Sequence, residues 1–143
     1  MKQIYFLIIS AIILAGHQAA RLIIFPFAAG HGGIIEVTPF FNLVEVWNHG
    51  ISFGMFRELA YGQWLLSGLS LIITAILLFM LQQMNDRLSA IAYSLIIGGA
   101  IGNVFDRLRF GAVADYLDFH LFGYHWPAFN VTDMAIVSGI FLL

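Results

Sequence analysis

The feature that most constrains this chain is an apolar segment without a charged residue, GQWLLSGLSLIITAILLFMLQQM, at residues 62–84. As an α-helix it would be about 34 Å long, enough to cross the ~30 Å hydrocarbon core of a bilayer. The chain as a whole is 61% hydrophobic and only 10% charged, whereas soluble domains average about 25% charged residues. The sequence therefore predicts a membrane protein, and its 143 residues suit a single domain, residues 1–143.

Three other segments are typical of membrane helices. Residues 4–25 are apolar over a longer stretch than the roughly 7–15 residues of a signal-peptide core, so we expect a retained first helix. Residues 89–105 form a shorter span, in which Gly98 and Gly102 share a face that another helix can approach closely. Residues 131–143 should form a fourth helix, but at about 20 Å it is too short to cross. Either the helix is truncated or it ends inside the membrane, and we favour truncation.

Four spans would place both termini on one side of the membrane and the segments 26–61 and 106–127 together on the other. Within the first segment, residues 40–47 are rich in aromatic and branched side chains, and the turn residues Asn-His-Gly follow at 48–50. This pattern predicts a hairpin or curved sheet on the membrane surface. The expected fold class is an all-α membrane protein with four transmembrane helices and a small extracytoplasmic β-hairpin or curved sheet between helices 1 and 2.

Polar side chains in a bilayer are costly unless they have a partner or a function. Several have a structural interpretation. Asp106 and Arg107 fit an ion pair at a helix end, and Asn130 with Asp133 fits a capping box. Asp118, His120 and His125 form only a weak metal-binding pattern, so we expect no metal and no cofactor. The polar clusters that need an explanation are His17, Gln18 and Arg21; Asn48 and His49; Asn103, Asp106, Arg107 and Asp115; and Asn130 and Asp133.

Asp115 and Asp133 favour a catalytic interpretation because of the predicted topology. Both lie near the outer interface, on segments that must converge for the bundle to close. Two carboxylates close together in a site of low dielectric constant retain a shared proton near neutral pH, as in aspartic proteolysis. The chain has no cysteine, and no serine or histidine lies in a nucleophile motif.

Three sequence regions resemble signature regions of bacterial lipoprotein signal peptidase, the signal peptidase II family. They are NHGISFG, GGAIGNVFDRLRFGAVADYLDF and FNVTDMAIVSG, in this order along the chain. The resemblance implies a four-helix aspartyl endopeptidase of the bacterial inner membrane that removes the signal peptide from diacylglyceryl-modified prolipoproteins. Its partners would be the lipid-modified preprotein and membrane lipid, with no nucleic acid, and it would act as a monomer with its site on the extracytoplasmic face.

Matched by motif, the resemblance implies that Asp115 and Asp133 are the catalytic pair. It also implies a set of substrate-binding or supporting residues, which are Asn48, Gly50, Asn103, Asp106, Arg107, Asn130 and Arg21. The first span departs from the usual Asp-Gln-x-x-Lys pattern, because HQAAR has His17 for the aspartate and Arg21 for the lysine. Thr132 stands where alanine is usual.

Two other functions are compatible with these residues. A non-catalytic paralogue that binds lipopeptide would account for His17 and the short fourth helix. A small proton-coupled carrier would use intramembrane carboxylates as relays, but residues 62–84 offer only Ser67, Ser70 and Thr74 as hydroxyl groups for such a path. The residues favour the peptidase over both.

Overall fold

A computed structural model describes residues 2–50 and 58–143. It contains four α-helices and a small antiparallel sheet among these residues. The helices are α1 (Leu7–Ala29, preceded by the 3₁₀ turn η1, Lys2–Phe6), α2 (Gly62–Gln83), α3 (Arg87–Phe110) and α4 (Val131–Leu142). The strands are β1 (Ile34–Thr38), β2 (Phe41–Asn48), β3 (Val113–Leu121) and β4 (Tyr124–His125). Residues 51–54 of the NHGISFG motif lie outside the described residues.

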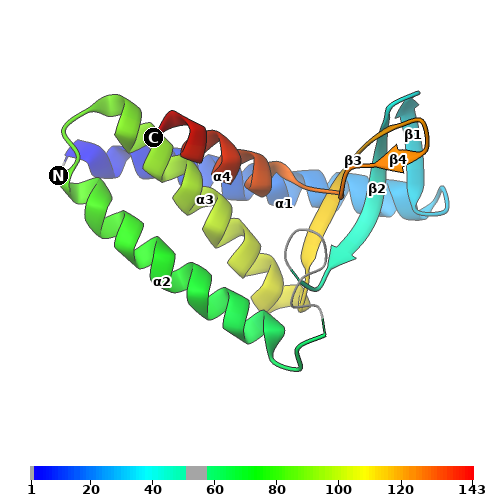
Figure 1. The fold of residues 1–143 in the computed structure, drawn as a ribbon, viewed down its shortest axis with the longest axis horizontal. Helices are drawn as coiled ribbons and strands as arrows, with labels where there is room; N and C mark the ends of the chain where they lie inside the picture. The colour runs from blue at the N-terminus through cyan, green and yellow to red at the C-terminus, as the bar shows by residue number, and fades with distance from the viewer. Residues whose placement is uncertain (1, 51–57) are drawn as a thin grey trace.

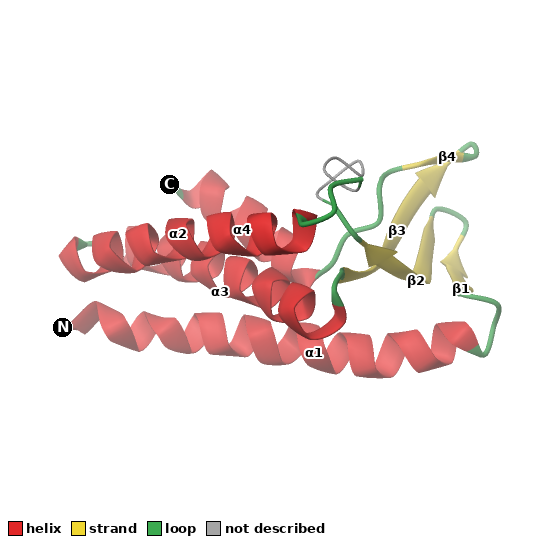
Figure 2. Ribbon diagram, turned by 90° about the horizontal axis from the view of Figure 1, so that it is seen from below, coloured by secondary structure: helices red, strands yellow, loops and turns green. Residues whose placement is uncertain are grey.

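The helices form a bundle at one end of the molecule, and the sheet lies at the other end of α1 (Figures 1 and 2). Both termini lie at the end of the bundle remote from the sheet, in agreement with the predicted topology. In the described part of the chain, three helical segments are long and apolar enough to cross a membrane: Gln3–Ala29, Gly62–Gln83 and Arg87–Phe110. Helix α4 is apolar but shorter.

Two helices are longer than predicted. Helix α1 continues through Pro26 to Ala29 instead of ending at residue 25, and the Pro26 carbonyl still accepts a hydrogen bond from Gly30. Helix α3 starts at Arg87, where the Asp86 carboxylate caps the Ser89 amide at 2.7 Å. Its last residue is Phe110, and Gly111 follows with a φ of 72°, the left-handed conformation that glycine favours after a helix.

The helices and a small sheet agree with the predicted class, but the sheet of the described residues has four strands and is larger than the predicted hairpin. Its strand order is β1-β2-β3-β4, with every neighbouring pair antiparallel. Strands β1 and β2 form the predicted hairpin after the first helix, whereas β3 and β4 come from the segment 106–127, expected to be a loop. Pairing of β2 with β3 joins the two outer segments and sets Val46 opposite Asp115.

Helix α3 is at the centre of the bundle and packs against α1, α2 and α4. Small residues permit this. A Cβ atom on Gly98 would lie 2.7 Å from the Ser10 Cα of α1, and one on Gly139 of α4 would lie 2.6 Å from Ile96. A side chain on Gly102 would collide with Thr132 of α4. The predicted close approach is therefore confirmed, but Gly98 and Gly102 contact two different helices.

Candidate active site

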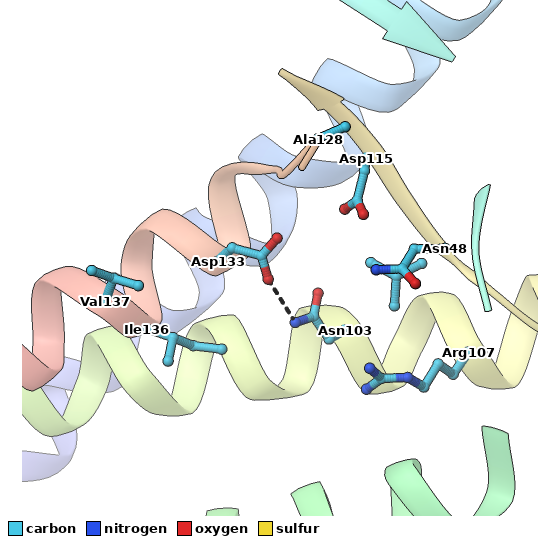
Figure 3. Close-up of a pocket in the computed structure, with 9 residues that line it drawn as sticks. Asn48, Asn103, Arg107, Asp115, Ala128, Asp133, Ile136 and Val137 are labelled. Carbon is cyan, nitrogen blue, oxygen red and sulfur yellow. Dashed lines mark hydrogen bonds between the residues drawn. The ribbon is translucent and has the colours of Figure 1, made fainter. Parts of the chain in front are cut away.

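A cavity of about 260 Å³ lies where the sheet meets α3 and α4. Five polar side chains from four elements point toward it or line its wall, and Figure 3 shows both carboxylates directed into it. Four apolar residues complete the wall, so about half of the lining is polar. The lining residues are Asn48, Asn103, Arg107, Asp115 and Asp133, with Val113, Ala128, Ile136 and Val137.

The positions of the Asp115 and Asp133 carboxylates are set by strand β3 and helix α4. Asp115 is the third residue of β3 and is only 2% exposed. It pairs with Val46 of β2, and its carboxylate contacts the buried Asn130 side chain. Asp133 is the third residue of α4, in the position that completes a capping box with Asn130. The predicted capping box is confirmed, and the same geometry directs Asp133 into the cavity. The structural and the site interpretations of this residue are therefore compatible.

Asn130 connects the two carboxylates. Its side-chain Nδ2 donates to Asp115 Oδ1 at 2.8 Å, and its Oδ1 accepts from the Asp133 backbone N–H at 3.0 Å. The Asn130 backbone N–H donates to Asp133 Oδ2 at 3.2 Å. Because Asn130 is fully buried, water does not compete for these contacts, and a single amide side chain holds β3 and the start of α4 in register.

The electrostatics of the cavity favour proton retention on Asp115. Burial, followed by the nearby negative charge of Asp133, raises the pKa of Asp115 from 3.8 to about 7. Hydrogen bonds from Asn48 and Asn130 oppose this rise. A carboxyl group that titrates near neutral pH can exchange a proton during a reaction.

The remaining polar groups of the cavity are also held in place. Asn103 Nδ2 donates to Asp133 Oδ1 at 3.3 Å, and its own Oδ1 accepts from the Thr132 hydroxyl. Arg107 Nη2 donates to the Gly50 carbonyl at 3.4 Å, and its charge lies within electrostatic reach of Asp133 and Asp115. The hydroxyl of Thr132, which appeared in the sequence only as a departure from a motif, therefore orients Asn103.

Four expected site residues are not among the cavity lining: Gly50, Asn130, Asp106 and Arg21. Gly50 and Asn130 still contact lining residues, whereas the hydrogen bonds of Asp106 and Arg21 are to other described residues. Asp106 is fully buried and makes its 2.8 Å hydrogen bond with His17 of α1, whereas Arg107 lines the cavity, so the expected Asp106–Arg107 ion pair is absent from the described residues. Arg21 lies over the Phe110 ring, 4.5 Å from its centroid, and donates to Gln18. Asp106 and Arg21 therefore contact the scaffold behind the cavity. Sequence reasoning gave no role to Tyr116, the partner of His17.

The residues of the weak metal-binding pattern, Asp118, His120 and His125, lie in the sheet. Asp118 accepts hydrogen bonds from His125 Nδ1 at 2.9 Å and from Asn42 Nδ2 at 3.0 Å. Within residues 2–50 and 58–143, no three histidine, aspartate or glutamate side chains form a group that could hold a metal ion. This cluster therefore stabilises the sheet at a distance from the cavity.

Residues 7–143 match the family model described as Signal peptidase (SPase) II. The lipoprotein signal peptidase of Anaplasma phagocytophilum is 40% identical over 139 residues, covering 97% of this chain and 88% of that protein. The lipoprotein signal peptidase of Tolumonas auensis is 46% identical over 127 residues, covering 85% of this chain and 76% of the relative.

Solved structures agree with these sequence matches. Two structures described as a bacterial membrane enzyme superpose with a TM-score of 0.82 at 27% identity, covering 96% of this chain and 84% or 88% of theirs. The apolar helices indicate a membrane protein, and the family indicates a protease. The chain belongs to the signal peptidase II family.

Proposed function

We propose that this chain is an aspartyl endopeptidase that removes the signal peptide from diacylglyceryl-modified prolipoproteins. The observation that carries the proposal is the pair of carboxylates, Asp115 and Asp133, directed into one cavity and joined by Asn130. Family membership supplies the class of substrate.

In the proposed mechanism, the two carboxylates share one proton and water is the nucleophile. The ionised carboxylate accepts a proton from water as the water oxygen attacks the scissile carbonyl. The protonated carboxyl donates to the carbonyl oxygen, and proton return to the leaving amine breaks the C–N bond. The raised pKa of Asp115 supports this proposal, because one proton then remains on the pair near neutral pH.

The other polar groups have supporting roles in this proposal. The Arg107 guanidinium stabilises negative charge that develops in the cavity, and Asn103 holds Asp133 through its 3.3 Å hydrogen bond. Asn48 holds Asp115 in the same way. Asn130 keeps the two carboxylates at a fixed separation.

An apolar cavity beside the carboxylates fits a lipid-modified substrate. It has a volume of about 400 Å³ and shares Ala128, Asp133 and Val137 with the polar cavity. A substrate with acyl chains next to its scissile bond can place apolar groups here while its peptide reaches the aspartates. We further propose that the chain works as a single-domain monomer in the inner membrane, with this face extracytoplasmic.

The test is cleavage of a purified diacylglyceryl-modified precursor by the protein in detergent or vesicles. We expect cleavage before the lipid-modified cysteine. The same precursor without its lipid should be cleaved far more slowly, because the apolar cavity is then empty. Equal cleavage of both precursors would contradict the proposed substrate class.

The aspartates are tested in the same assay with a matched control. Asp115→Asn and Asp133→Asn should each abolish cleavage while the protein remains folded and membrane-inserted. Asp118→Asn is the control, because Asp118 is also a buried carboxylate on β3 but contacts Asn42 and His125 outside the cavity. Normal turnover by either of the first two variants would end the assignment.

A further inference from the structure

His17 lies behind the active-site cavity and is fully buried on α1. Both of its ring nitrogens have partners on other elements. Nε2 lies 2.8 Å from Asp106 Oδ2 of α3, and Nδ1 lies 3.1 Å from the Tyr116 hydroxyl of β3. The His17 and Tyr116 rings are also stacked, with centroids 5.7 Å apart. One side chain therefore joins three elements of the fold.

The Asp106 contact leads to the strand that carries Asp115. Asp106 Oδ2 also accepts from the Ala114 backbone N–H at 3.0 Å, and its Oδ1 accepts from Gln18 Nε2 at 2.8 Å. Three N–H groups thus point at the two oxygens, an arrangement suited to an ionised carboxylate. Ala114 directly precedes Asp115, so hydrogen bonds connect His17 to the backbone beside Asp115 through Asp106.

The Tyr116 contact leads to the helix that carries Asp133. Tyr116 directly follows Asp115, and its hydroxyl oxygen accepts from the Val131 backbone N–H at 3.3 Å. Val131 is the first residue of α4, two positions before Asp133. The Tyr116 side chain is only 1% exposed, so the contact is protected from water.

The hydrogen-bond directions are consistent along the whole network. An ionised Asp106 requires a proton on His17 Nε2, and the neutral imidazole then offers Nδ1 as an acceptor. The Tyr116 O–H donates to Nδ1 while its oxygen accepts from Val131. The neutral imidazole therefore satisfies all of these buried groups. Removing its two nitrogens would leave the Tyr116 O–H without its acceptor and would take away one of the three donors to Asp106.

We propose that His17 is a positioning residue for the aspartate pair. It reaches Asp115 through Asp106 and Ala114, and Asp133 through Tyr116 and Val131, without lining the cavity itself. The proposal rests on the proposed function, because it assigns a role in aligning the two proposed catalytic groups.

The kinetic test compares variants that remove the network with one that removes an equivalent contact elsewhere. His17→Phe keeps an aromatic ring but removes both nitrogens, and Tyr116→Phe removes only the hydroxyl. Ser10→Ala is the control, because Ser10 Oγ makes a buried 2.6 Å hydrogen bond to the Ser94 carbonyl, also between α1 and α3. Its position lies two helical turns from His17 and away from the cavity.

We expect His17→Phe and Tyr116→Phe to lower kcat by roughly 10- to 100-fold, since small misplacements of catalytic groups have effects of this size. KM should change little, because neither side chain lines the cavity. Ser10→Ala should lower the thermal midpoint without lowering kcat. If His17→Phe and Tyr116→Phe lose stability but keep kcat within about twofold of wild type, the positioning role is refuted.

A second measurement does not depend on activity. Hydrogen–deuterium exchange should accelerate in peptides covering residues 113–117 and 130–133 of Tyr116→Phe, and stay unchanged there in Ser10→Ala. Unchanged exchange in both segments of Tyr116→Phe would overturn the inference, and this result does not depend on any cleavage measurement. Cleavage that survives Asp115→Asn would instead overturn the proposed function, so the two failures are distinguishable.

Discussion

Replacement of Asp115 by asparagine should stabilise the folded protein at neutral and alkaline pH while it abolishes cleavage. Burial and the nearby Asp133 charge raise the pKa of Asp115 from 3.8 to about 7. At about 1.4 kcal/mol per pKa unit, ionisation of this side chain in the folded protein costs about 4 kcal/mol more than in an unfolded chain. Asparagine carries no charge, and its amide oxygen can still accept the hydrogen bond from Asn130.

The pH dependence follows from the sign of this difference. Between pH 3.8 and about 7 the folded wild-type protein binds more protons at Asp115 than the unfolded chain does, so its stability falls as the pH rises through this window. Above about pH 7 the loss is complete. The advantage of Asp115→Asn should therefore be absent near pH 4, grow toward pH 7 and then stay constant.

The assay is thermal unfolding of both proteins in the same detergent at a series of pH values from 4 to 9. With about 2–4 °C per kcal/mol for a protein of this size, the midpoint of Asp115→Asn should exceed that of wild type by about 8–16 °C at pH 8. Asp118→Asn serves as the control. A difference that is the same at every pH, or a lower midpoint for Asp115→Asn at pH 8, would refute the electrostatic reasoning.

Other predictions concern the scaffold. Gly98→Ala should lower the thermal midpoint strongly, because its Cβ would lie 2.7 Å from the Ser10 backbone. Gly68→Ala in α2 is the control, since its Cβ would have no atom within 4 Å and the variant should be neutral or stabilising. Equal effects of the two variants on the midpoint would contradict the packing argument. Asp86→Ala should lower the midpoint through loss of the cap on Ser89, and Asp86→Asn should retain most of that stability. The hydrogen bond from the Ser89 N–H holds the pKa of Asp86 below 3.8. The extra stability of wild type over Asp86→Asn should therefore be present above pH 3.8 and disappear as the pH falls below 3.8. Thermal unfolding between pH 2 and 7 measures this difference.

The helices were predictable because hydropathy and length alone define them. Residues 62–84 were predicted to within one residue of α2. Helix α3 extends beyond the predicted residues 89–105 because the residues that cap it, Asp86 and Gly111, lie outside the apolar segment. The sequence also carried a capping box at Asn130 and Asp133, and this local pattern was confirmed.

The sheet was predicted only in part. Strand β3 has the sequence VADYLDFHL and lies in the segment 106–127, which was expected only to connect two spans, yet Asp115 and Asp118 are both buried in it. Each is buried because an amide side chain from elsewhere in the chain, Asn130 or Asn42, donates to it. Such partners are distant in sequence, so local patterns do not reveal them.

The candidate site was predictable by motif rather than by geometry. The resemblance pointed to Asp115 and Asp133, and the structure directs both into one cavity. The partner of Asp106 was not predictable, because His17 lies 89 positions away. The sequence showed His17 only as a departure from a motif, whereas its two hydrogen bonds appear only once α1, α3 and β3 are assembled.

The central claim, that Asp115 and Asp133 act as one catalytic unit, is tested most directly by a double-mutant cycle in the cleavage assay. The rate of precursor cleavage is measured for wild type, Asp115→Asn, Asp133→Asn and the double variant. If the two carboxylates share one proton, removal of either one removes the function of both. Each single variant should therefore lose as much activity as the double variant. Single losses that multiply in the double variant, or a single variant that still cleaves, would contradict the account.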